Sequence, residues 1–185
     1  MDEEEPLTSI VCTAHVASSV RLSPHGHYTR QHKLTDNDKT LSSILSTAYE
    51  KEPDCEPSLI LLSTDSKAAW AQYTLESVTQ PEVLESFTTP FAGMTVESVA
   101  RYIYENGSGT IVNTRYVLIA DERTAKDSTL LLVEIDFDNP EVLERVRIAG
   151  DYANAEAVTL TVKGGGMEEL QSLVDGDGVY RGGDE

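Results

Sequence analysis

Two aspartates stand where open α/β sheets usually gather their ligands, directly after runs that the sequence predicts as strands. Asp65 follows a short apolar run, and Asp121 follows a longer one. If the two strands are parallel neighbours, the carboxylates converge at the carboxyl edge of the sheet, with Trp70 and Arg123 nearby. Such a pair can act as general acid and base or hold a cation. The alternative is structural, because aspartate is also a natural helix N-cap and turn former.

All four histidines lie in one N-terminal stretch, close to Cys12. Imidazole and thiolate are ligands of zinc and related metals, so His25, His27 and His32 are candidate metal ligands. The spacing argues against this, because no Cys-x-x-Cys or His-x-x-x-His pair places two ligands on one helical face. On a strand, His25 and His27 would point one way and His32 the other. We therefore predict solvated hairpin histidines, and we expect no metal and no cofactor.

Two glycine-containing segments match ligand loops only in part. Three glycines at 164–166 precede a predicted helix, but the Lys-Ser/Thr of a phosphate-binding loop is missing, and Glu168 and Glu169 would repel an anion. The segment 175–178 resembles the start of a calcium loop, whose closing glutamate would fall beyond Glu185. There is no nucleophile elbow, and a serine triad would have to take its histidine from the N-terminal cluster. The sequence thus shows no recognisable catalytic motif.

The charge of the chain is strongly negative. Its 185 residues include 32 acids against 14 lysines and arginines, for a formal charge of −18. Residues 1–57 hold 10 acids and 5 bases (net −5), and residues 58–185 hold 22 acids and 9 bases (net −13). Such a field repels phosphate backbones and anionic lipids, so we expect no nucleic-acid binding and no membrane binding. It favours a basic protein partner, with solubility alone as the alternative.

The compartment can be predicted from the cysteines and the N-terminus. Cys12 and Cys55 are too few for a disulfide framework and suit a reducing compartment. Residues 1–6 have neither the basic nor the apolar region of a signal peptide, and no apolar run approaches the length of a membrane span. We therefore expect a cytoplasmic protein, and the oligomeric state stays open.

An acidic, proline-containing linker at 50–57 divides the chain into an N-terminal extension, residues 1–57, and a main domain, residues 58–183. In the extension, the β-favouring segments 8–17 and 27–34 flank a turn and predict a loose hairpin. An amphipathic helix follows, because its apolar residues recur at helical spacing: Leu41, Ile44, Leu45, Ala48 and Tyr49.

The main domain alternates predicted strands with predicted helices. Strands are expected at 59–62, 115–120, 130–136, 145–148 (an exposed or edge strand) and 158–162, and helices at 65–78, from 95 to about 105, and at 167–174, with a helical turn at 151–157. The strand that begins at Leu130 follows too short a connection to lie parallel to its predecessor. We predict an α/β (or α+β) fold, with a mixed central sheet of about four to six strands and helices packed on it.

The order of several motifs resembles an uncharacterised family. These are an apolar strand with Thr64-Asp65, then Ala68-Ala69-Trp70, Phe91-Ala92-Gly93-Met94-Thr95, Val117-Leu118-Ile119-Ala120-Asp121, and Asp175-Gly176-Asp177-Gly178-Val179-Tyr180-Arg181-Gly182. In that order they are similar to domain of unknown function 6924, found in small proteins of actinobacteria and some fungi. The resemblance covers residues 58–182. It departs at 151–166, where family members tend towards an aromatic and Asn-rich stretch. It implies a fold and no mechanism.

The charge and the lack of a catalytic motif together favour a non-enzymatic, acidic protein that acts through protein contacts. The alternative is a small cofactor-independent enzyme, such as an isomerase, cyclase or hydrolase, using Asp65 and Asp121. A self-associating structural protein is a third possibility. A concave, largely apolar cavity lined by the two carboxylates would favour the enzyme.

Overall fold

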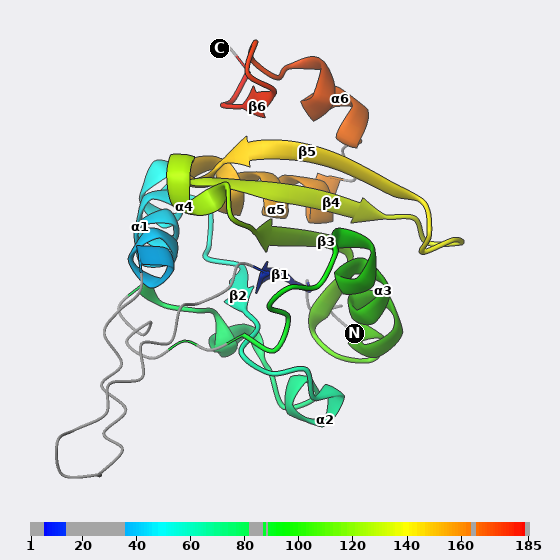
Figure 1. Ribbon diagram of the computed structural model, residues 1–185. Helices are drawn as coiled ribbons and strands as arrows, with labels where there is room; N and C mark the ends of the chain where they lie inside the picture. Colours follow the sequence, from blue (N-terminus) through cyan, green and yellow to red (C-terminus); the bar gives the residue numbers. More distant parts are fainter. Residues whose placement is uncertain (1–5, 14–35, 82–86, 88, 164–165, 184–185) are drawn as a thin grey trace, which may run out of the picture.

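The computed structural model describes residues 6–13, 36–81, 87, 89–163 and 166–183. Within them, six strands form one mixed sheet in the order β2-β1-β3-β4-β5-β6. The strands are β1 (Leu7–Cys12), β2 (Leu59–Leu61), β3 (Val112–Ala120), β4 (Thr129–Ile135), β5 (Leu143–Ala149) and β6 (Val179–Tyr180). Figure 1 shows this order from β2 and β1 up to β6. The expected α/β fold with a mixed central sheet is confirmed.

All strands except β4 run in one direction. β1 pairs in parallel with both β2 and β3, and β5 pairs in parallel with β6. β4 is antiparallel to both of its neighbours, β3 and β5. The connection from β3 to β4 contains only the one-turn helix α4 (Thr124–Asp127), which is too short for a parallel crossover. The antiparallel orientation expected from the sequence is therefore confirmed.

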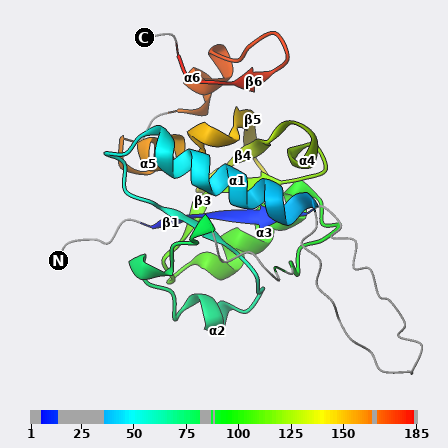
Figure 2. The ribbon, with the colours of Figure 1, turned by 90° about the vertical axis from the view of Figure 1, so that its left-hand side faces the viewer.

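Helices cover both faces of the sheet. On one face pack α1 (Asp36–Lys51), α5 (Ala153–Lys163) and α6 (Met167–Ser172), around a core that includes Ile44, Leu118 and Leu160. On the other face pack α2 (Lys67–Trp70) and α3 (Val96–Gly107), around a second core that includes Val99 and Val117. Two 3-10 turns, η1 (Leu75–Ser77) and η3 (Gly150–Tyr152), complete the elements described here. Figure 2 shows α1 in front of the sheet and α3 behind it.

The two longest helices form where the apolar spacing predicts them. In α1 the residues at helical spacing, Leu41, Ile44, Leu45 and Ala48, are all buried. In α3, the Thr95 hydroxyl caps the first turn by accepting a hydrogen bond from the Ser98 N–H at 3.2 Å.

Two of the predicted elements are wrong in type or extent. The β-branched stretch 158–162 is part of helix α5, because Ala153, Ala157 and Leu160 recur at helical spacing and are buried against the sheet. The helix expected over 65–78 is reduced to α2 and η1, and its N-cap is Ser66 instead of Asp65. The segment 145–148 is a strand with an exposed side, as expected, and β6 pairs with its outer edge only at Arg147 and Ile148.

Strand β1 lies in the middle of the sheet. Both of its edges are paired, with β2 on one side and β3 on the other, so residues 7–12 have no edge left for a hairpin partner. The remainder of the expected hairpin, together with His25, His27 and His32, lies outside the described residues. Because β1 and α1 share the sheet and the core with the later elements, the chain on both sides of the 50–57 segment forms one structural unit.

The winding of the chain reverses around β1. The connection from β1 to β2 includes α1 on one face, and the connection from β2 to β3 includes α2 and α3 on the other. The carboxyl ends of β1 and β3 therefore form a topological switch point, the position where open α/β sheets bind ligands. Asp121 is the first residue after β3, so it lies at this switch point.

Candidate functional site

The two candidate aspartates lie at the same edge of the sheet but are not neighbours. β2 and β3 are both parallel to β1, so the residues that follow them emerge at the same end. β1 lies between the two strands, which separates Asp65 from Asp121 by one strand position. Asp65 is exposed, and Tyr102 donates a hydrogen bond to its backbone carbonyl. The strands that precede the two aspartates are thus parallel but not neighbours, which is only part of the condition for the carboxylates to converge.

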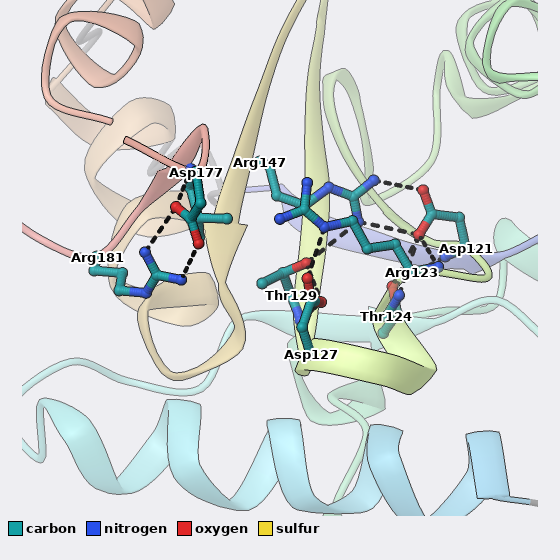
Figure 3. Close-up of polar contacts among 9 residues, drawn as sticks. Asp121, Arg123, Thr124, Asp127, Thr129, Arg147, Asp177 and Arg181 are labelled. Carbon is teal, nitrogen blue, oxygen red and sulfur yellow. Dashed lines mark hydrogen bonds and ion pairs between the residues drawn. The ribbon is translucent and has the colours of Figure 1, made fainter. Parts of the chain in front are cut away.

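Asp121 is bound to an arginine on another strand. Arg147 extends from β5 past β4 and forms a two-pronged ion pair with it, with Nη1–Oδ1 at 3.0 Å and Nη2–Oδ2 at 2.5 Å (Figure 3). The Arg147 side chain is 11% exposed and that of Asp121 30%. Thr129 of β4 also lies beside the guanidinium, with its Oγ1 at 3.4 Å from Nη1.

The turn after β3 fixes the other side of the same carboxylate. Asp121 Oδ1 accepts hydrogen bonds from the backbone N–H groups of Arg123 at 3.0 Å and Thr124 at 3.2 Å. In return, the Thr124 hydroxyl accepts a hydrogen bond from the Asp121 N–H at 3.0 Å. This is the side-chain-to-backbone turn that aspartate favours. Asp121 is therefore a turn former, the structural role expected for it, and it lies at the switch point.

The hydrogen bonds keep the Asp121 carboxylate ionised. Burial alone raises the pKa of Asp121, but the Arg147 guanidinium and the backbone N–H groups of Thr124 and Arg123 outweigh burial and lower the pKa below its ordinary value. A general base near neutral pH needs a raised pKa and an accessible lone pair. Asp121 has a lowered pKa, and its oxygens already accept several hydrogen bonds. Its geometry suits a structural anchor better than a proton-transfer group.

Arg123 and Trp70 do not face the two aspartates. The Arg123 guanidinium pairs with Asp127 on the next turn, with Nε–Oδ2 at 2.6 Å. Trp70 is fully buried, its indole N–H donates to the Thr64 carbonyl at 2.9 Å, and its ring meets Tyr102 edge-on at 5.9 Å. Trp70 is therefore a core residue that presents no surface to a ligand.

The two aspartates of the Asp-Gly-Asp-Gly loop near the C-terminus form ion pairs with an arginine of the same chain. Arg181 forms ion pairs with both carboxylates. Its Nη1 lies 2.6 Å from Asp175 Oδ2, and its Nη2 lies 2.7 Å from Asp177 Oδ2 (Figure 3). The Arg181 guanidinium lowers the pKa of Asp177 to about 2. The two aspartates that resemble the start of a calcium loop are thus partners of Arg181. The described residues contain no group of three or more His, Cys, Asp or Glu side chains that could hold a metal ion.

Each of the six arginines in the described part of the chain forms an ion pair with a carboxylate. They are Arg101, Arg115, Arg123, Arg145, Arg147 and Arg181. Sequence reasoning did not identify Arg147 as a site residue. The alternation of 145–148 does indicate that Arg145 and Arg147 share a face, but a strand pattern does not reveal which carboxylate lies across that face.

Described residues line three open hollows on the surface, of about 430 to 460 Å³ each. One lies between α1 and the Gly150 turn, one beside the Gly107–Thr110 turn, and one between α5 and residues 52–56. Neither Asp65 nor Asp121 lines any of the three. No helix among the described residues has the length and hydropathy needed to cross a membrane.

Comparison with known proteins places the chain in one family. Residues 57–183 match the family model described as "Domain of unknown function (DUF6924)", which covers more than half of the chain. The chain belongs to this family, so the resemblance seen in the sequence is confirmed. No curated protein and no solved structure matches the chain. The family match begins at residue 57, whereas the sheet also includes β1, which precedes it.

Proposed function

We propose that this protein is a non-enzymatic, acidic binding protein whose partner is a basic protein. The observation that carries the proposal is the pairing of all six described arginines with carboxylates of the same molecule. These guanidinium groups are engaged internally, while the chain as a whole carries a formal charge of −18. A surplus of acids attracts a positively charged surface and speeds its association.

The state of the switch point supports binding over catalysis. The carboxylate that would have to act as acid or base, Asp121, is ionised and held by Arg147 and by two backbone N–H groups. Asp65 is exposed and one strand position away. An enzyme that used this pair would first have to break the Asp121–Arg147 ion pair.

We further propose that the protein works in the cytoplasm. Cys12 is buried, Cys55 is half-buried, and neither forms a disulfide. Burial and the nearby charges of Glu52 and Glu56 raise the pKa of the Cys55 thiol, so it stays protonated at neutral pH. Two cysteines that form no disulfide suit a reducing compartment.

The test is capture of partners from a lysate of the source organism at two salt concentrations. The full chain is immobilised, and bound proteins are identified by mass spectrometry at about 0.05 M and about 0.5 M salt, a change that shortens the Debye length several-fold. An unrelated protein of similar negative charge is the control for simple ion exchange. We expect a basic protein that is retained at low salt by this chain only, and its purified form should associate at least about tenfold more slowly at high salt.

Two results would count against the proposal. One is a partner whose affinity for the chain does not change with salt. The other is a set of captured proteins identical to that of the control, which would reduce the charge to a matter of solubility. Turnover of a small molecule that is lost in both D65N and D121N would favour the enzyme alternative instead.

A further inference from the structure

The loop between β4 and β5 presents an aromatic side chain to solvent. Phe137 is 81% exposed, whereas Phe87 and Phe91 are buried. Val142, at the other end of the same loop, is 51% exposed. We call residues 136–142 the hairpin tip. Figure 1 shows it extending beyond the rest of the sheet, at the end opposite α1 and α4.

Internal hydrogen bonds hold the backbone of the hairpin tip. The Asp136 carboxylate accepts from the N–H groups of Asp138 at 2.9 Å and Asn139 at 2.8 Å. The Val142 N–H donates to the Asn139 carbonyl at 2.9 Å, and the Asp136 N–H donates to the Val142 carbonyl at 3.1 Å. The tip is therefore a closed turn, and Phe137 projects from a fixed backbone.

Helix α3 anchors the hairpin tip from the side. The Tyr104 hydroxyl donates to the Phe137 carbonyl at 2.9 Å, and Arg101 forms an ion pair with Glu141. The hairpin tip is thus attached to α3 through the Phe137 carbonyl and the Glu141 side chain. An aromatic side chain on a fixed backbone has few torsions to lose when it binds, so its burial by a partner contributes to affinity at a small entropic cost.

The charge around the ring is acidic. The hairpin tip holds Asp136, Asp138 and Glu141 and no basic residue. Arg101 pairs with Glu141. Arg115, which pairs with Glu134, also interacts with Asp136. An apolar aromatic centre with a charged rim is the arrangement found at binding hot spots. Its complement is a basic surface with an apolar recess.

We propose that the hairpin tip is the surface by which this chain binds its partner, a basic protein with an apolar recess that receives the Phe137 ring. This assignment rests on the proposed function and adds the location of the contact. A second copy of the chain is the poorer occupant, because two acidic tips and two net charges of −18 would repel each other.

The test compares F137A with L75A, a matched removal of an exposed apolar side chain. Leu75 is 46% exposed and belongs to η1, which follows α2 on a different part of the surface. The probe is the basic protein that the wild-type chain captures at low salt, purified and titrated directly against each full-length variant. Thermal melts should show both variants to be as stable as wild type, because neither side chain is buried.

We expect F137A to weaken binding of this probe at least about tenfold and L75A to leave it within about twofold. F137W should retain the affinity, and its added indole should shift its emission to shorter wavelength on binding, while the buried Trp70 should not respond.

Different failures have different meanings. If the basic probe binds F137A and wild type equally, the hairpin tip is not the contact, and the proposed function stands. If the wild-type chain captures no salt-sensitive basic protein, the proposed function is wrong, and the partner assigned to the tip is wrong with it. Self-association of the wild type that is lost in F137A would also overturn the inference, because it would make a second copy the occupant.

Discussion

Replacing Asp121 with asparagine tests whether the ion pair to Arg147 stabilises the switch-point edge. An asparagine can keep the Oδ1 acceptor that binds the N–H groups of Arg123 and Thr124. It replaces the charged oxygen that faces Arg147 Nη2 with a neutral group. Arg147, whose side chain is only 11% exposed, then has no counter-ion at this position. D121N therefore removes the charge that faces Arg147 while keeping the acceptor that holds the turn.

The size of the effect follows from how far the pair is buried. A solvent-exposed ion pair contributes about 0 to 1 kcal/mol, and removal of one partner of a fully buried pair costs about 3 to 5 kcal/mol. The side-chain exposures of 11% and 30% place this pair between the two cases. We expect D121N to lower the free energy of unfolding by about 2 kcal/mol. D65N removes an exposed carboxylate at the same edge and should change it by less than about 0.5 kcal/mol.

The assay is equilibrium unfolding in urea at neutral pH for wild type, D65N, D121N, R147M and the D121N/R147M double variant. The midpoints should shift without a change in slope, and the double variant should lose less stability than the sum of its single variants. A D121N effect no larger than that of D65N would refute the reasoning. So would strict additivity of D121N and R147M, because it would mean that the two groups do not interact.

The pH dependence supplies a second check on the same pair. The pKa of Asp121 is lower in the folded state than its ordinary value of about 3.9. A lowered pKa stabilises the fold above the unfolded-state value, and this stabilisation is lost as the pH falls through the folded-state value. The stability difference between wild type and D121N should therefore be complete above a pH of about 5 and shrink below it. A difference that stays constant into strong acid would contradict the ion-pair explanation.

Further substitutions test the packing that positions these elements. At Gly150 an added Cβ would lie 2.6 Å from the Ser128 carbonyl oxygen, so G150A should lower the free energy of unfolding in urea by about 2 kcal/mol. A Cβ added at Gly176 would have no atom within 4 Å, so the control G176A should change this free energy by less than about 0.5 kcal/mol. Equal stability of G150A and G176A would contradict this prediction, because it would mean that the backbone at Ser128 shifts at little energetic cost. Asn154 is buried and accepts a hydrogen bond from the Ser58 N–H at 2.9 Å, so N154A should lower the free energy of unfolding by about 2 to 3 kcal/mol. The control is N106A, which removes a half-buried amide on α3 and should cost less than N154A in the same urea unfolding assay.

Periodic, capped segments could be predicted from the sequence because their local pattern and their tertiary burial agree. Helix α3 combines a Thr95 cap with one apolar face, and both signals act within a few residues. The direction of β4 was predictable for a similar reason, since the length of the preceding connection alone forbids a parallel pair. Such features depend on neighbours in the sequence.

The errors come from contacts between distant parts of the chain. Residues 158–162 have β-branched side chains, but the burial of Ala157 and Leu160 against the sheet overrides that local preference. The position of β1 could not be predicted, because nothing local reveals that both of its edges pair with strands that follow much later in the chain. The pairing of β6 with Arg147 and Ile148 of β5 could not be predicted, because β6 is only two residues long.

The candidate site shows the same division between local and distant information. The position of Asp121 after a strand was visible in the sequence, whereas its partner, Arg147, depends on the register of two antiparallel pairings. In β5, burial of Val146 and Ile148 against the α1 side forces Arg145 and Arg147 onto the opposite face. There Arg145 meets Glu97 of α3 and Arg147 meets Asp121. The alternation that builds the core thus also places these two arginines beside acids of their own chain. The exposed aromatic ring of the hairpin tip lies among acids at the other end of β4, which is why we look for the partner there.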